Sequence, residues 1–224
     1  DVLPIPIIWD NKEYLDLIDI GFHEFYEKLS TSSTLPTTSQ PSTGTVKKYV
    51  DKYIDEGYTD LIIITLSSGI SSFYNNVLSV ADEESRINIH PFDCKITCAG
   101  EANAAILAGR LVKAGADIDL IMHDLKDLRN TTDVRFMVAN LNHLKRTGRL
   151  SNAASFDEER EAEWVSDYES SFPKVKIYQS IIGPVVGVHV GQHTMAMIWG
   201  RDLDSYFDEN GKPIKDIKSK VVED

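Results

Sequence analysis

The stretch of sequence that decides the fold is Leu61–Tyr74, which reads LIIITLSSGISSFY. Its apolar, β-branched first half is typical of a buried strand in a parallel sheet, and an amphipathic helical pattern begins at Ile70, after hydroxyl side chains and a glycine. The stretch therefore predicts a strand, a tight turn and a helix. Free backbone N–H groups and the positive end of a helix dipole meet at such a turn, so Ser67 and Ser68 are candidates for binding an anion. Ordinary helix capping around a glycine turn is the structural alternative.

Strand and helix patterns alternate on both sides of this stretch within residues 1–139. The apolar runs that predict further strands are Leu3–Trp9, Ile87–Phe92 and Val134–Ala139. The periodic segments that predict helices are His23–Leu29, Val46–Ile54, Ala102–Ala114 and Ile118–Leu128, with Ser42 as an N-cap and Gly115 as a C-cap. Turns are predicted at Asp10–Lys12 and Asp208–Gly211. The alternation indicates an α/β fold in which helices cover a parallel sheet.

The composition limits the classes of function. The chain has 224 residues, of which 42% are apolar, with 23 basic and 35 acidic side chains and a net charge of -12. Such an acidic protein is a poor candidate for binding nucleic acid or an anionic membrane surface, so an anionic ligand must be attracted locally. Cys94 and Cys98 have no further Cys or His at metal-binding spacing, which favours two reduced thiols in a cytoplasmic protein. No apolar run reaches the ~18 residues of a membrane span, so we expect no stable membrane insertion.

Two further loops carry polar groups that could contribute to a site. Thr37–Ser42 leads into a predicted helix, and helix capping is its structural alternative. In Gly187–Gly191, His189 has glycines two residues away on each side, and such glycines permit close backbone approach or unusual dihedral angles. A structural histidine is the alternative there. Arg149 is a weaker candidate, because an arginine that closes a helix C-terminus explains it as well.

These residue types favour binding of a carboxylate over catalysis. Ser68 lacks the glycine-flanked nucleophile elbow of a hydrolase, since Leu66 stands where that motif has glycine. Neither a phosphate-binding loop with lysine nor a dinucleotide fingerprint is present, and the histidines are too scattered to predict a metal site. Hydroxyls, a helix N-terminus and a histidine can together bind a carboxylate in an apolar crevice without lysine. The apolar candidates to line a slot for the ligand tail are Ile70, Phe73, Ile106 and Met197.

Four segments, in order along the chain, resemble motifs of the DegV family of bacterial fatty-acid-binding proteins. Thr37–Ser42 is similar to the family's TSQPS segment, and Leu66–Tyr74 is similar to its LSSGLSGTY segment. Leu141–Asn152 resembles its LxYLKKGGRIS stretch, and Ile182–Gly191 resembles the start of its IGPVIGxHxGPG motif. The final GPG of that motif is Gly191-Gln192-His193 in this chain. Ser205–Lys220 resembles a hairpin of the family. In the family this hairpin follows an apolar strand, and this sequence has no such strand before Ser205.

The resemblance implies a DegV-like two-domain α/β fold with the ligand between the domains. Residues 1–139 would form a parallel-sheet N-terminal domain, and residues 140–224 a smaller α/β domain that carries Arg149 and His189. The implied ligand is a long-chain fatty acid in a buried tunnel. The positions expected to contact its carboxylate are Thr38, Ser39, Ser67, Ser68 and His189. Arg149 matches an arginine near the surface around that site, where it would contact a partner or an acyl phosphate.

The resemblance also implies a role in a kinase system. In acyl-carrying subunits of bacterial fatty acid kinase, a separate catalytic subunit phosphorylates the bound carboxylate from ATP, which feeds phospholipid synthesis. By this interpretation the protein presents the fatty acid, needs no cofactor of its own and is not the phosphotransferase. A stand-alone esterase or phosphotransferase that uses Ser68 and His189 remains the alternative, and a regulatory protein with a vestigial crevice is a third possibility.

Overall fold

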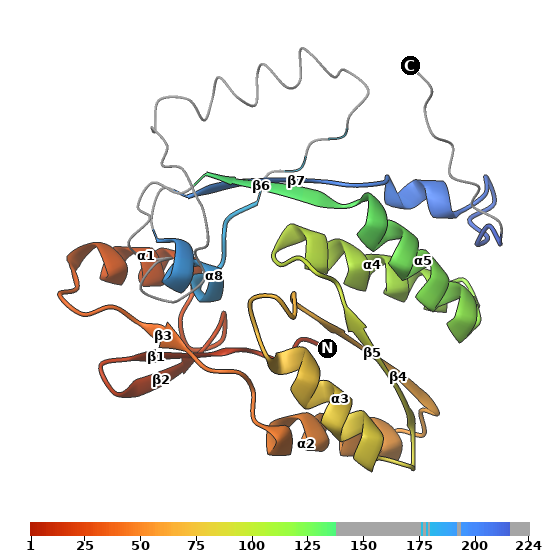
Figure 1. The fold of residues 1–224 in the computed structure, drawn as a ribbon, viewed down its shortest axis with the longest axis horizontal. Coiled ribbons are helices and arrows are strands. Elements are labelled where there is room, and N and C mark those ends of the chain that lie inside the picture. The colour runs from red at the N-terminus through yellow and green to blue at the C-terminus, as the bar shows by residue number, and fades with distance from the viewer. Residues whose placement is uncertain (138–175, 177, 179, 192–193, 216–224) are drawn as a thin grey trace.

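The computed structural model describes residues 1–137, 176, 178, 180–191 and 194–215 of the chain. Small sheets and the helices around them make up this part of the molecule (Figure 1). The sheets have the strand orders β2-β1-β3, β4-β5 and β6-β7. The predicted α/β class is confirmed, although among these sheets only β4-β5 is parallel.

The N-terminal sheet is antiparallel and centres on β1 (Pro6–Trp9). Asp10 and Asn11 have φ angles of 52° and 62°, as a two-residue type I′ turn requires, and β2 (Lys12–Leu15) returns along β1. β3 (Thr37–Thr38) pairs with the other side of β1. Because the tight turn reverses the chain at once, β1 does not join the parallel sheet in which the alternating pattern placed it.

The strand at the start of the Leu61–Tyr74 stretch is parallel to its neighbour, as predicted. β4 (Asp60–Thr65) and β5 (Asn88–Asp93) form this pair, and α3 (Phe73–Glu83) lies in the crossover between them. The register places Thr65 opposite Asp93. The carboxyl ends of both strands therefore meet at one edge, and the turn that follows β4 lies beside the loop that follows β5.

Helices cover both faces of the β4-β5 pair (Figure 1). α2 (Thr43–Asp55) and α3 pack on the face that carries Ile63, whereas α4 (Ala99–Lys113) and α5 (Ile118–Thr131) pack on the face that carries Ile64. Burial on both faces explains why β4 is a continuous apolar run rather than an alternating one. Within the described ranges, no helix combines the length and the apolar character needed to cross a bilayer.

Both predicted helix caps are found. Ser42 Oγ accepts the Thr45 N–H at 3.1 Å and so begins α2. Gly115 follows Ala114, the C-cap of α4, and has a φ of 79°. Glycine adopts this left-handed conformation without strain, so the helix ends where the sequence predicts.

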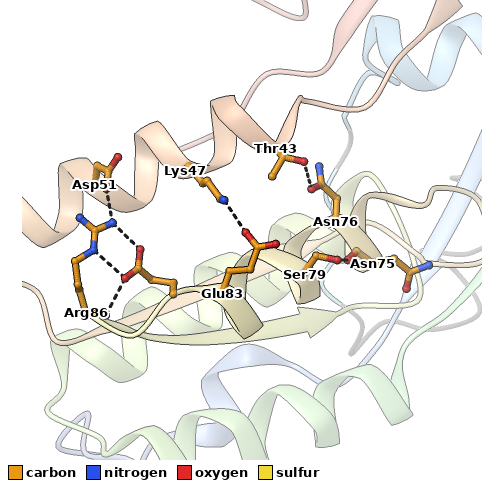
Figure 2. Close-up of polar contacts among 9 residues, drawn as sticks. Thr43, Lys47, Asp51, Asn75, Asn76, Ser79, Glu83 and Arg86 are labelled. Carbon is orange, nitrogen blue, oxygen red and sulfur yellow. Dashed lines mark hydrogen bonds and ion pairs between the residues drawn. The ribbon is translucent and has the colours of Figure 1, made fainter.

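A row of polar contacts joins the exposed sides of α2 and α3 (Figure 2). In order along α2, the bonded pairs are Thr43 with Asn76, Lys47 with Glu83, and Asp51 with Arg86, which lies just after the end of α3. Because the residue numbers rise together, the two helices are parallel and their N-termini lie at the same end. Exposed ion pairs contribute only about 0.2–1 kcal/mol each, so the apolar contacts beneath them stabilise this layer more.

β6 (Asp133–Met137) lies outside the parallel sheet, contrary to prediction. It pairs antiparallel with β7 (Met195–Trp199), a strand distant in sequence. A short helical turn at Leu203–Tyr206 follows, and then the predicted turn Asp208–Gly211, in which the Gly211 N–H donates to the Asp208 carbonyl at 2.9 Å. Local patterns therefore located β6 and the Asp208–Gly211 turn, but they predicted neither β7 nor its pairing with β6.

α8 (Pro184–Val190) brings a segment from late in the chain to the N-terminal sheet. Pro184 stands at the first helical position, where the missing N–H costs no hydrogen bond. α8 packs with β1 and α1 (Phe22–Thr31) around one buried apolar cluster. The division into residues 1–139 and 140–224 stays a prediction, since much of the second part lies outside the described residues.

Candidate functional site

A cavity of about 630 Å³ lies beyond the carboxyl end of β4. Its walls come mainly from the β3–α2 loop, the β4–α3 turn and α8. The lining residues are Ile5, Thr38, Ser39, Gln40, Pro41, Leu66, Ser68, Ile70, Ser71, Ser72, Phe73, Asn75, Thr97, Val185, Val186, His189 and Val190. The volume falls within the roughly 300–1,000 Å³ of small-molecule sites, and open α/β sheets bind ligands at the carboxyl ends of their strands.

Most of the predicted site residues meet at this cavity. Those that line it are Thr38, Ser39, Ser68, Ile70, Phe73 and His189. Ser67 is not among the lining residues, and its Oγ accepts the Gly69 N–H at 3.2 Å. Arg149 lies outside the described residues.

Ile106 and Met197, the other two apolar candidates, lie away from the cavity lining. Ile106 is 51% exposed on α4, because the opposite side of that helix buries Leu107 in the core. Met197 stands in β7 opposite Arg135 of β6. The sequence shows that both side chains are apolar, but only the packing shows which surface each one joins.

The polar end of the cavity joins two segments that lie 151 residues apart in sequence. Thr38 Oγ1 and His189 Nε2 are 2.9 Å apart, and the tautomer of the histidine decides which of the two atoms donates. Thr38 is placed by its pairing with Ile7 of β1, and His189 by the position of α8. The structure thus places next to each other a threonine and a histidine that the sequence predicted to share a site.

Gly187 and Gly191 have the two roles predicted for the glycines around His189. A Cβ at Gly187 would come within 2.8 Å of Phe25 Cε1 and of Tyr26 Oη, so its absence allows α8 to approach α1 closely. Gly191 ends α8 with a φ of 79°, and its N–H donates to the Gly187 carbonyl at 2.8 Å. Burial raises the pKa of Tyr26 to about 12, which keeps its hydroxyl protonated.

Asp16, which follows β2 in the sequence, is a titratable residue whose side chain contacts the first turn of α8. Its side chain accepts the Val185 N–H, while its Oδ1 atom is buried without a hydrogen-bond partner. Burial raises the pKa of Asp16 to about 6, and the hydrogen bond from Val185, which favours the charged form, only partly opposes this.

Replacing Asp16 with asparagine should stabilise the protein near pH 7, by on the order of 1 kcal/mol, and have little effect near pH 4. The folded-state pKa of about 6 lies above the unfolded value of about 3.9, so the wild-type protein loses stability as the pH rises through this window. Asparagine keeps an acceptor for Val185 and removes the buried charge. Urea denaturation at several pH values measures the difference, and a difference that does not vary with pH would contradict the assignment.

Asp93, which the sequence patterns did not single out, is the partner of Ser68. Ser68 Oγ donates to Asp93 Oδ2 at 2.6 Å, and the Ser68 N–H donates to Oδ1 at 3.1 Å. Asp93 is 7% exposed; burial opposes its ionisation, but hydrogen bonds from Ser68 and Lys95 outweigh this and lower its pKa. The signal that could have identified Asp93 is its place at the end of β5, since adjacent parallel strands end at one edge.

The backbone N–H groups of residues 67–71, in the β4–α3 turn, already have hydrogen-bond partners, whereas the sequence predicted free N–H groups beside Ser67 and Ser68. The groups already engaged are those of Ser67, Ser68, Gly69, Ile70 and Ser71. Two of them, on Ile70 and Ser71, donate to the Ser67 carbonyl at 3.1 and 3.2 Å, because the turn closes on itself before α3 begins. The turn therefore offers hydroxyl groups to the cavity, together with the positive dipole end of α3, and the β3–α2 loop adds that of α2.

The cavity wall carries little charge. Among the lining residues that the structure describes, His189 is the one titratable side chain, and none is Lys or Arg. Ser68 donates its hydroxyl proton to Asp93, so the serine–histidine pair of a serine hydrolase is not formed between Ser68 and His189. The residues that the structure describes also contain no group of three or more His, Cys, Asp or Glu side chains suited to binding a metal ion.

The sequence matches a known family over most of its length. A family model described as uncharacterised proteins of the DegV family matches residues 1–159. The chain belongs to the DegV family. A DegV domain-containing protein of Staphylococcus aureus is 30% identical over 207 residues, which cover 91% of this chain and 68% of that protein. Protein DegV of Bacillus subtilis is 25% identical over 255 residues, which cover 88% of this chain and 90% of that protein.

Solved structures of DegV proteins share the fold. A crystal structure of DegV from Bacillus subtilis, described as a fatty acid binding protein, has a TM-score of 0.80 at 24% identity and covers 89% of this chain and 91% of that chain. A fatty acid binding DegV family protein from Streptococcus agalactiae also has a TM-score of 0.80 at 24% identity, covering 90% and 91%. The DegV-like α/β fold predicted from the four motifs is therefore confirmed.

Proposed function

We propose that this DegV protein binds a long-chain fatty acid in the cavity. The observation that carries the proposal is the cavity wall, which combines apolar side chains with a polar end and, among its described residues, has no Lys or Arg. The carboxyl group would lie against Thr38, Ser68 and His189, with Ser39 close by, and the tail would follow apolar side chains such as Phe73. The relatives described as fatty acid binding proteins support the same ligand class.

We further propose that the protein presents the fatty acid to a separate kinase in the cytoplasm. The kinase would transfer phosphate from ATP to the bound carboxyl group, and the acyl phosphate would enter phospholipid synthesis. Arg149 would contact the kinase or the acyl phosphate. The resemblance of the four motifs to those of acyl-carrying subunits of fatty acid kinase supports this step.

Mass spectrometry of lipids extracted from the purified protein tests the ligand. We expect a long-chain fatty acid in a fixed ratio to protein. A protein that retains no fatty acid, and binds none when titrated with one, would contradict the proposal. Formation of product from a fatty acid and ATP by the protein alone, with no kinase added, would instead favour the stand-alone enzyme.

Replacing Ser68 or His189 with alanine should weaken fatty-acid binding by about 5- to 150-fold while the protein stays folded. Each change removes one hydrogen-bonding group from the polar end of the cavity, and an unmade hydrogen bond costs about 1–3 kcal/mol. Titration with a fluorescent fatty acid measures the affinity. Ser30→Ala and His90→Ala are matched controls, because Ser30 lies on the exposed side of α1 and His90 pairs with Asp60 at the surface. Equal affinities for the site variants and the controls would show that the polar end is assigned wrongly.

A further inference from the structure

Asp93 decides which kind of hydrogen bond Ser68 can make with a ligand. Ser68 Oγ lies 2.6 Å from Asp93 Oδ2, and an ionised carboxylate can only accept, so the hydroxyl proton of Ser68 points at Asp93. What Ser68 Oγ then presents to the cavity is its lone pairs. A ligand group that bonds to Ser68 must therefore supply the hydrogen.

The backbone holds Asp93 in this orientation. Its Oδ1 accepts the N–H groups of Ser68 and Lys95 at 3.1 and 3.0 Å, so the carboxylate cannot rotate without losing both bonds. Arg129 of α5 donates to the Asp93 backbone carbonyl at 3.0 Å and lies against the ring of Phe92. Oδ2 is thereby left to accept the Ser68 hydroxyl.

The charged and titratable groups around Asp93 leave it ionised. Burial alone would raise the pKa of Asp93, but the hydrogen bonds from Ser68 and Lys95, together with the charge of Lys95, lower it. Burial raises the pKa of the adjacent Cys94 thiol to about 12 and that of Glu101, on α4, to about 7. The Cys94 thiol is therefore neutral at pH 7, and within the described part of the chain the charged acceptor bonded to Ser68 is Asp93.

The rest of the described cavity wall offers a carboxylate few compensating charges. None of these lining residues is Lys or Arg, and the N–H groups of residues 67–71 are engaged. His189 shares a hydrogen bond with Thr38 and is the one titratable lining group. The dipoles of α2 and α3 favour an anion, but a carboxylate oxygen facing the Ser68 lone pairs would place two acceptors in contact.

We propose that the fatty acid binds in its neutral form, with the acid O–H donated to Ser68 Oγ and the acid carbonyl oxygen accepting from the Thr38–His189 pair. Asp93 is then a positioning residue that acts through Ser68, and the inference rests on the proposed fatty-acid function. The proton comes from the solvent, so binding tightens as the pH falls toward the pKa of the free acid. The described residues of the cavity wall include no Lys or Arg, and taking up a proton is the usual response of a carboxyl group that enters an apolar site without a cation.

The ionisation state of the bound acid can be measured directly. Palmitic acid labelled with carbon-13 at its carboxyl carbon is bound to the protein, and its chemical shift is followed against pH. We expect the pKa of the bound acid to rise from about 4.3, the value of an ordinary carboxyl group, to above about 7. A bound acid that is ionised at pH 7 would overturn this inference alone, whereas the absence of any bound signal would overturn the proposed function as well.

Asp93→Asn should reverse the hydrogen bond without changing its geometry. The two backbone N–H groups keep Oδ1 in place, so Nδ2 takes the position of Oδ2 and donates to Ser68 Oγ, which then turns its own proton toward the cavity. The pKa of the bound acid should fall by about one unit or more. Asp60→Asn is the matched control, because Asp60 lies at the opposite end of β4 and pairs with His90, and it should leave that pKa unchanged.

Ser68→Ala separates the hydrogen bond from the charge of Asp93, because it removes the acceptor and keeps the carboxylate. We expect the pKa of the bound acid to fall in this variant too. A pKa that falls in Asp93→Asn but stays unchanged in Ser68→Ala would assign the effect to the charge of Asp93 alone and overturn the inference. The same comparison distinguishes positioning from a structural role, since partial unfolding would lower the amount bound without changing the ionisation of what remains.

Discussion

Replacing Gly187 with alanine should lower the free energy of unfolding by about 1–3 kcal/mol and weaken fatty-acid binding by about tenfold or more. The new Cβ would lie 2.8 Å from Phe25 Cε1 and Tyr26 Oη, so α8 must move away from α1. α8 carries His189, whose Nε2 is 2.9 Å from Thr38 Oγ1, and this distance does not survive a shift of the helix. Urea denaturation and titration with a fluorescent fatty acid measure the two effects.

Gly109→Ala is the matched control for this change. Gly109 also lies in a helix, α4, but nothing stands within 4 Å of the Cβ that it would gain. Alanine should stabilise this exposed helical position by about 0.5–1 kcal/mol and leave binding unchanged. If alanine lowers the free energy of unfolding at Gly187 but raises it at Gly109, then contact with α1, rather than helix propensity, decides the effect at Gly187. Two stabilising changes would contradict the close packing of α8 on α1.

Replacing Phe25 with alanine should have the largest effect on stability, a loss of about 3–5 kcal/mol. Phe25 is 0% exposed and meets Trp9 edge to face, with ring centroids 5.6 Å apart. Its cluster joins β1, α1 and α8, so the cavity left by the ring would loosen α8, which carries His189, and β1, with which Thr38 pairs. Urea denaturation measures the loss, and the carbon-13 signal of bound palmitic acid reports whether the site still forms.

Phe22→Ala is the control for Phe25, because Phe22 lies in the same helix and loses the same atoms. Phe22 is only half-buried and does not belong to the cluster around Trp9, so its loss should cost much less. Combining Phe25→Leu with Gly187→Ala provides a further check. If the two positions pack against each other as the structure shows, the smaller side chain at position 25 should recover part of the stability that the alanine at position 187 costs. Strictly additive losses would contradict the contact.

The features predicted best from sequence are those that depend on neighbouring residues. The continuous apolar run before Ser67 identified a buried parallel strand, since a strand with helices on both faces must be apolar on both sides. Ser42 and Gly115 marked the ends of two helices because capping is a contact within a few residues. The glycines around His189 indicated close approach and a positive φ, and Gly187 and Gly191 supply one each.

The features that prediction missed depend on contacts between distant segments. β1 and β6 looked like members of the parallel sheet, yet each pairs antiparallel with a strand that no local pattern specified. The N–H groups of residues 67–71, expected to be free, already have partners, and one of these partners is Asp93, which is 25 residues from Ser68 in sequence. Ile106 has the right apolar character for a tail-binding slot but faces outward.

The sequence by itself determined the class of fold and two helix ends, and it named polar residues as candidates to bind a carboxyl group, because propensity, capping and periodicity act over one or two turns of chain. Only the tertiary structure decided how those residues work together. It placed Thr38 against His189 across 151 residues and turned the Ser68 hydroxyl toward Asp93. The direction of a hydrogen bond depends on which donors and acceptors meet in space. Packing brings these groups together from segments that are distant in sequence, so local sequence patterns cannot predict the meeting.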